Sequence, residues 1–470
     1  MPSPSLPTAS LTPRLWLRLP HPALGWLAIF ALVGLSALCL VAHVGGVLRL
    51  LFPAGTFVVG GWLYWRYPLL YVGFTWWIWF LSPWVRRVVD QQGGWVDPSP
   101  ILLAPLLVTL ITLVTLLRWL PKSLKQGGLP FLLCILAVIY GGLVGLIQNS
   151  PTSAILNCLG WIAPVLFGFH LFMFWRHYPD YRQNLQRVFL WGTLLMGGYG
   201  VAQYLIAPEW DRFWMVNAGL SSIGTPEPLG IRVFSTMNAP QPFAGVLMAG
   251  LLLLFCDRAS LRFAAGGVGY LAFLLSSARS AWLSWLLALL SFLPSLKASL
   301  QMRLIGSLFV LAIVVIPLIN LEPFSTVIAP RLQSLSNVEA DGSYNARSNG
   351  YNQLLGEILV NPIGEGFGAT TESGEIGARD SGILALFLSL GWFGGIPYLA
   401  GMGLIFFRLF QGTESRFDVF AGASRAIALG AFSQIGLNVA TAGAIGMVLW
   451  SFLGIGMAAN QFYQQRDKSR

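Results

Sequence analysis

Charged residues are scarce in this chain. Only 10% of its 470 residues are Asp, Glu, Lys or Arg, whereas 56% are hydrophobic, and its mean hydropathy is +0.68. In soluble globular domains about a quarter of the residues are charged, so that class is excluded. Apolar runs of about twenty residues recur from end to end, and each can cross a hydrocarbon layer roughly 30 Å thick. The sequence therefore predicts an all-α, polytopic membrane protein.

Cysteine and histidine are also rare. They are Cys39, Cys134, Cys158, Cys256, His21, His43, His170 and His177. The cysteines lie in apolar runs at wide spacings, which favours small core residues over a disulfide framework or a zinc site. The histidines form no spaced set of ligands. We therefore expect no metal and no cofactor.

The lengths of the apolar runs predict about 12 to 14 transmembrane helices. The ranges are 23–42, 46–64, 67–84, 101–119, 129–147, 153–175, 188–206, 238–256, 262–277, 280–296, 303–320, 381–408, 419–439 and 442–460. The first run follows Arg14 and Arg18, but it exceeds the apolar core of a secretory signal peptide, which has about 7 to 15 residues. We expect it to be retained as a span.

The distribution of Lys and Arg predicts which loops face the cytoplasm. An even number of spans puts both termini on one side, and because both termini are basic we place them in the cytoplasm. The loops that alternation then assigns to the cytoplasm are basic too: 121–126, 176–187, 257–262, 296–303 and 408–416. This distribution explains the net charge of +10 without nucleic acid as a partner. Arg86 and Arg87 do not fit, because alternation places them in an outer loop.

Three other segments are predicted on the outer side: 207–237, the turn from Ser277 to Ser280, and the long hydrophilic segment 321–380. Residues 1–230 are interpreted as N-terminal transmembrane helices, and 231–470 as the membrane region that carries this large loop. We expect function in the second region.

Three arginines are predicted at the outer surface. Arg279 lies in the turn between two spans, Arg232 precedes a span whose entrance contains Asn238, and Arg347 begins a predicted helix. On that helix Arg347 shares the apolar face with Tyr351. Guanidinium groups bind phosphate oxygens in a bidentate fork, so converging arginines suit a lipid-linked phosphate or pyrophosphate. Separate anchoring to lipid headgroups is the alternative.

Four stretches occur in an order that points to a family: "GIRVFSTMNAPQPFAG" (230–245), "SSARSAWL" (276–283), "SYNARSNGYNQLLGEILVNPIGEGFG" (343–368) and "DSGILALFLSLGWFGG" (380–395). In order and spacing they resemble the O-antigen ligase and O-antigen polymerase superfamily of bacterial surface polysaccharide synthesis. The earlier spans resemble it only in hydropathy.

The resemblance implies a metal-independent inverting glycosyltransferase of the bacterial inner membrane. Its donor would be an undecaprenyl-pyrophosphate-linked glycan at the outer face, and a flippase and a chain-length regulator would be its partners. Arg232 and Arg279 match the family's pyrophosphate-handling arginines, and Arg347 matches the loop arginine. Ligases have a His-Asn pair where this chain has Asp380-Ser381, so the resemblance favours polymerisation of repeat units over ligation to lipid A.

Such a reaction needs a base within about 3 Å of the acceptor hydroxyl. We expect Asp380 to be this base, together with Arg279 and Arg232 as the other catalytic residues. A helix N-cap is the alternative role for Asp380. Glu357 and Glu365 are the alternative bases. The expected substrate-binding residues are Arg347, Asn238, Tyr351 and Arg331.

Other readings of the sequence stay open. A glycan ligase that moves a finished polymer to an acceptor is one, and a transporter of a small solute such as inorganic carbon is another. Coupled transporters place ionisable groups in mid-membrane, and His170 is the one such group deep in a predicted span.

"GEGFG" (364–368) follows a helix and a proline instead of a strand, which indicates a turn and not a nucleotide loop. Trp210 and Trp214 are candidates for stacking on sugars.

Overall fold

The computed structural model describes most of the chain as helix. The described residues are 22–219, 223–299, 301–302, 304–306, 309, 356, 358–369, 381–412, 415 and 418–468. All regular elements among them are helical, apart from one isolated bridge between Gly224 and Ile231. The all-α class is confirmed for these residues. Most of the large loop 321–380 lies outside them.

Seven of the described helical segments are long and apolar enough to cross a membrane. They are α1 (Ala23–Val41), α2 (Gly45–Arg66), the segment Pro100–Lys125, α6 (Leu129–Gln148), α7 (Pro151–Met173), α16 (Gly382–Gln411) and α18 (Gly443–Lys468). The segment Pro100–Lys125 comprises η1 (Pro100–Leu102), α4 (Leu103–Leu110) and α5 (Leu113–Lys125). The protein is therefore a membrane protein by the length and composition of its helices.

The remaining main helices complete the bundle. They are α3 (Pro68–Gly93), α8 (Tyr178–Ile206), α9 (Glu209–Ala218), α10 (Pro240–Leu253), α11 (Leu261–Leu275), α12 (Arg279–Phe292) and α17 (Val419–Ser433). Short 3₁₀ turns extend α10 through η4 (Leu254–Cys256) and follow α17 as η6 (Gln434–Gly436). Thirteen of the fourteen predicted span ranges are thus helical, and 303–320 lies almost entirely outside the described residues.

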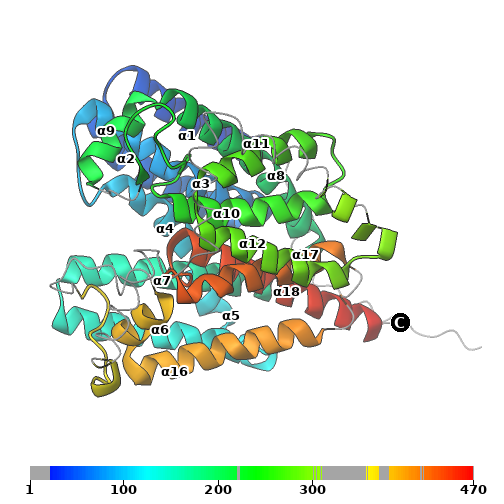
Figure 1. Cartoon of the computed structure of the whole chain (residues 1–470). Helices are drawn as coiled ribbons and strands as arrows, with labels where there is room; N and C mark the ends of the chain where they lie inside the picture. Colours follow the sequence, from blue (N-terminus) through cyan, green and yellow to red (C-terminus); the bar gives the residue numbers. More distant parts are fainter. Residues whose placement is uncertain are drawn as a thin grey trace, which may run out of the picture.

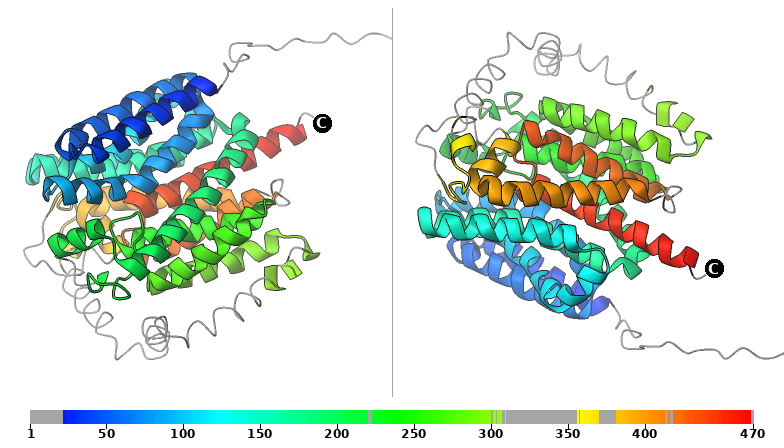
Figure 2. Two further views of the ribbon diagram at one scale, coloured as in Figure 1. Left: turned by 90° about the horizontal axis from the view of Figure 1, so that it is seen from above. Right: turned by 90° about the horizontal axis from the view of Figure 1, so that it is seen from below.

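The long helices run side by side, and their connections gather at two ends of the bundle (Figures 1 and 2). We call the end that carries the start of α1 and the end of α18 the terminal end. The opposite end, where α9 lies, is called the distal end. Both views in Figure 2 show the start of α1 and the end of α18 on the same side.

Helices from both halves of the chain interleave. α18 packs along α7, and α16 packs along α6. The contact between α7 and α18 is made by backbone, because a Cβ at Gly454 would lie 2.1 Å from the carbonyl oxygen of Gly168. Small residues permit this close approach of membrane helices. Residues 1–230 and 231–470 therefore share one core.

Several predicted boundaries were wrong. α8 begins at Tyr178 instead of residue 188, α3 continues to Gly93 instead of ending at 84, and α18 continues to Lys468 instead of ending at 460. The extension of α3 is stabilised by Asp90, which pairs with Arg86 at 3.1 Å within the helix and with Arg49 of α2 at 3.2 Å. Arg86 and Arg87 therefore belong to a helix and not to an outer loop.

Candidate functional site

Arg87 holds the segment that precedes α10. Its side chain is fully buried and forms an ion pair with the fully buried Asp211 of α9. It also donates hydrogen bonds to the carbonyl oxygens of Ser235 and Met237, and its guanidinium lies 4.9 Å from the ring centroid of Phe234. Arginine presents several donors in a fixed fork, so one side chain binds two carbonyls of the segment and also Asp211 of α9.

Gln203 of α8 holds the same segment from the other side. Its Oε1 accepts from the backbone N–H groups of Phe234 at 3.0 Å and Ser235 at 2.8 Å. Its Nε2 donates to Asp211 at 2.8 Å. Gln203, Asp211 and Arg87 thus form one buried network that binds residues 234–237. Arg232 precedes this segment in the sequence, and Asn238 follows it.

Arg232 contacts the turn between α11 and α12, which leads directly into Arg279. Arg232 donates from Nη2 to the carbonyl oxygen of Ser277 at 3.1 Å, and the N–H of Val233 donates to Leu275 at 3.2 Å. Arg279 is the first residue of α12, directly after this turn. The structure therefore brings the first two stretches of the family-like order, 230–245 and 276–283, into contact at the distal end.

Two serines in these stretches share an unusual backbone. Ser235 has φ 49° and Ser277 has φ 51°. Left-handed backbone is uncommon outside glycine, costs about 1–3 kcal/mol and persists where its surroundings fix it. In both cases a guanidinium binds the carbonyl of the serine: Arg87 binds that of Ser235, and Arg232 binds that of Ser277.

A row of uncharged polar side chains continues from Arg279 across the distal end. Gln241 of α10 donates to the hydroxyl of Ser280, and the amide of Asn438 lies 3.5 Å from both that hydroxyl and Oε1 of Gln434. We call Gln241, Ser280, Asn438 and Gln434 the amide row. Gln434 and Asn438 were not predicted as site residues, because isolated amides within the predicted span 419–439 carry no pattern.

The start of α16 lies beside the amide row. A Cβ at Gly382 would be 2.5 Å from the carbonyl oxygen of Asn438, so only glycine fits there without displacement. Ser381 caps the helix, since its side chain accepts from the N–H of Leu384 at 3.3 Å. The capping role considered for Asp380 is therefore filled by its neighbour.

The glycine-rich stretch around Glu365 is a packed loop. The backbone N–H of Glu365 donates to the carbonyl oxygen of Leu388 in α16 at 2.8 Å, and the carbonyl of Glu365 accepts from the side chain of Asn149 at 2.7 Å. Gly364 and Gly391 have positive φ values of 80° and 55°, and a Cβ on Gly364 would lie 2.4 Å from the backbone nitrogen of Gly391. The predicted turn is confirmed. The two last stretches of the family-like order, 343–368 and 380–395, meet through these glycines.

Several expected site residues lie outside the described residues. They are Asp380, Arg347, Tyr351, Arg331 and Glu357. Their roles stay predictions, as does the convergence of Arg347 with Arg232 and Arg279. Asn238 is described and is partly buried at the entrance of α10. Among the described residues, no three His, Cys, Asp or Glu side chains form a metal-binding group.

Trp214 does not suit sugar stacking. It is 3% exposed and packs against Phe234, with ring centroids 5.3 Å apart, in the small core under α9. Trp210 donates from its indole N–H to the hydroxyl of Tyr199 at 2.7 Å. Trp214 therefore stabilises the distal segment as a core residue.

The terminal end carries a contrasting polar cluster. Asp418 accepts from the hydroxyls of Tyr178 and Tyr463 at 2.8 Å each, and from Arg182 at 3.3 Å. Its other oxygen caps α17 by accepting from the N–H groups of Phe420 and Ala421. Five donors thus converge on one carboxylate, which joins α8, α17 and α18 as a structural tie.

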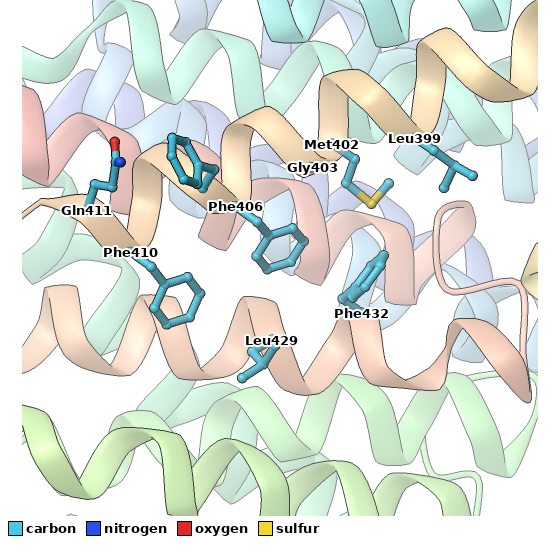
Figure 3. A pocket seen from close by; sticks show the side chains of 9 residues that line it. Leu399, Met402, Gly403, Phe406, Phe410, Gln411, Leu429 and Phe432 are labelled. Carbon is cyan, nitrogen blue, oxygen red and sulfur yellow. The ribbon is translucent and has the colours of Figure 1, made fainter.

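A groove of about 540 Å³ lies between α16 and α17 (Figure 3). Its lining is Leu399, Met402, Gly403, Phe406, Phe407, Phe410, Gln411, Leu429 and Phe432. It contains no ionisable side chain, so acid–base or phosphate chemistry has no support there. A second groove, of about 500 Å³, runs along α9 and includes Glu209 and Arg212.

No family model and no curated protein sequence matches this chain.

Proposed function

We propose that the protein is a membrane glycosyltransferase that polymerises oligosaccharide units carried on undecaprenyl pyrophosphate. The proposal combines the resemblance of residues 230–395 with one structural observation. That observation is the contact of Arg232 with the turn that presents Arg279. Two motifs far apart in sequence thereby meet at one turn of the distal end, which supports a shared role for their arginines.

The arginines would act on the leaving group. When the sugar leaves its carrier lipid, negative charge grows on the pyrophosphate. Fixed cationic donors stabilise that charge more in the transition state than in the ground state, and this lowers the barrier. Arg232 is held through Ser277, and the Arg87 network holds the segment that follows it. The site would therefore need little reorganisation during the reaction.

Asp380 is proposed as the base that accepts the proton of the attacking hydroxyl. It directly precedes Ser381, which caps α16. Gly382, the next residue, packs against Asn438, and Asn438 lies 3.5 Å from the hydroxyl of Ser280. Ser381 and Gly382, which follow Asp380 in the sequence, thus lie near the arginine-bearing turn, and this supports the proposal. Glu365 and Glu357 are the alternative bases.

The proposed membrane is the bacterial inner membrane, with both termini in the cytoplasm. The terminal end carries exposed basic residues, among them Arg176, Arg258 and Lys468. The basic residues of α3 at the distal end are instead bound to Asp90, Asp97 and Asp211. The positive-inside rule therefore favours the cytoplasm for the terminal end and the outer face for the distal end.

The buried ionisable groups do not favour transport as the alternative function. His170 is buried and bonded through Nδ1 to the hydroxyl of Thr115 at 2.7 Å, which in turn bonds Tyr64 at 2.8 Å. Asp90 and Asp211 are buried but are each paired with arginine. Paired carboxylates are poorly placed to exchange ions with a solute pathway.

Reconstitution tests the proposal directly. Purified protein in proteoliposomes should convert lipid-linked repeat units, extracted from cells that lack the protein, into longer lipid-linked chains. A product lengthened by whole repeat units supports polymerisation, and transfer of a preformed chain to another acceptor supports a ligase. Uptake of a labelled solute without any change of the glycan would contradict both.

A further inference from the structure

Two polar clusters of the bundle, one at the terminal end and one at the distal end, are satisfied to different degrees. At the terminal end, Asn460 donates to the carbonyls of Arg408 and Leu409 at 3.2 Å and accepts from Ser415, while Arg425 donates to Ser415 at 2.8 Å. These groups have the partners that a purely structural cluster requires.

The distal end has polar atoms that lack such partners. Within the described part of the chain, Nε2 of Gln434, Oγ of Ser277 and Oδ1 of Asn238 are buried without a hydrogen-bond partner. Gln434 itself has no solvent exposure. The amide of Asn438 makes two contacts of 3.5 Å, beyond the usual range of about 2.7–3.2 Å for such bonds.

An unmet donor inside a protein carries the full cost of its desolvation, so natural structures keep few of them without a use. A cluster that only joined helices would close these bonds. The nearby Ser433 does so, because it donates at 2.8 Å to Gly430 and pairs with Ser284 at 3.0 Å. The open donor of the amide row is Nε2 of Gln434, while the open Oγ of Ser277 and Oδ1 of Asn238 belong to residues three positions before Ser280 and Gln241.

We propose that the amide row, Gln241, Ser280, Asn438 and Gln434, binds hydroxyl groups of the sugar attached to the carrier pyrophosphate. This assignment rests on the proposed function. Amide and hydroxyl side chains both donate and accept, which matches sugar hydroxyls, whereas guanidinium groups only donate and match phosphate. Ser280 follows Arg279 directly, so the sugar-binding side chains begin where the pyrophosphate-binding side chains end.

Binding of short soluble donor analogues tests this division. The probes are farnesyl pyrophosphate and its derivatives with one N-acetylglucosamine, N-acetylgalactosamine, glucose or galactose on the pyrophosphate. Binding to the full-length protein in detergent is measured by calorimetry. Wild-type protein should bind farnesyl pyrophosphate, and at least one sugar derivative should bind about ten-fold or more tightly, as expected for two to three hydrogen bonds.

Asn438→Ala and Gln241→Ala should each lose most of that sugar-dependent gain while keeping the affinity for farnesyl pyrophosphate. Arg279→Ala should weaken both classes of probe. Ser433→Ala is the matched control, because it removes a satisfied hydrogen bond between α12 and α17 and should keep the gain.

The outcomes separate the two proposals. If a sugar strengthens binding but the amide variants keep the full gain, or if no sugar strengthens binding, the amide row is not the sugar site and the proposed function stands. If wild-type protein binds no probe at all, the pyrophosphate donor itself is wrong, and this assignment falls with it.

Discussion

Arg87 Nε lies 2.7 Å from Asp211 Oδ1, and neither side chain is exposed to solvent. This pair connects α3 to α9, and through the carbonyls of Ser235 and Met237 it also connects both helices to the entrance of α10. Breaking a buried ion pair leaves one charge uncompensated, which costs about 3–5 kcal/mol. The pair therefore controls how firmly the segment that carries Arg232 is held.

Arg87→Met should lower the melting temperature of the detergent-solubilised protein strongly, because Asp211 is left as an unpaired buried charge. The double variant Arg87→Met/Asp211→Leu should recover part of the loss, since it removes both charges. Arg49→Met is the control, because its partner Asp90 keeps Arg86. Equal losses for Arg87→Met and Arg49→Met would contradict a special role for the Arg87 network.

Local hydropathy predicted where nearly all the described helices lie, because an apolar run of sufficient length must cover its backbone within the membrane. It did not predict the end of α3, since that end depends on Arg49 from another helix. Nor did it explain why Arg86 and Arg87 stand in a supposed outer loop. Their partners come from distant parts of the chain and become visible only on packing.

The site was predictable to a similar extent. Arg232 and Arg279 were found by their position at span ends, and their contact with one turn agrees with that position. Gln434 and Asn438 were missed because a single amide carries no pattern in the sequence. Gly364 was expected in a turn, but its close contact with Gly391 requires the fold.

Replacing Arg279 should affect polymerisation according to the charge that remains. Arg279→Ala removes one or two charge-assisted hydrogen bonds of about 1.5–3 kcal/mol each, so the rate should fall roughly ten-fold to several-thousand-fold. Arg279→Lys keeps the charge and should lose far less. Turnover of lipid-linked repeat units in proteoliposomes measures both. Arg258→Ala, at the exposed connection of the terminal end, should retain the wild-type rate.

Gly366→Ala should disrupt the loop 361–369, which precedes α16 and packs against both α6 and α16. Its φ of 72° is unfavourable for alanine, and the added Cβ would lie 2.1 Å from the backbone nitrogen of Gly145. Strain of this kind costs about 1–3 kcal/mol, so a lower melting temperature is expected. Gly61→Ala in α2 meets no atom within 4 Å and should be neutral or slightly stabilising. A neutral Gly366→Ala would show that the loop does not depend on this close contact.

Polymerisation should survive EDTA. In the proposed mechanism Arg232 and Arg279 supply the positive charge that a divalent cation provides in many pyrophosphate reactions. The measurement is turnover before and after chelation, with Mg²⁺ added back to a parallel sample. Strict dependence on added Mg²⁺ would assign the neutralisation of the leaving group to a metal and remove the main role given to the arginines.

The last prediction separates polymerase from ligase and concerns Asp380. Cells without a polymerase should accumulate single lipid-linked repeat units, or one unit on the final acceptor, and lose long chains. Cells without a ligase should instead retain long chains on the carrier lipid. Gel separation of the lipid-linked and acceptor-linked glycans distinguishes the two results.

Asp380→Asn extends the same assay to the chemistry. The substitution keeps the size of the side chain but removes most of its basicity, so a base should show a severe loss of polymer. Ser381 caps α16, and the variant should therefore remain folded and inserted, which its melting temperature and membrane fractionation check. Ser381→Ala is the companion variant, because loss of a cap costs about 1 kcal/mol and should lower stability more than activity. Near-normal polymer from Asp380→Asn would transfer the role of base to Glu357 or Glu365, or leave activation of the donor to the arginines alone.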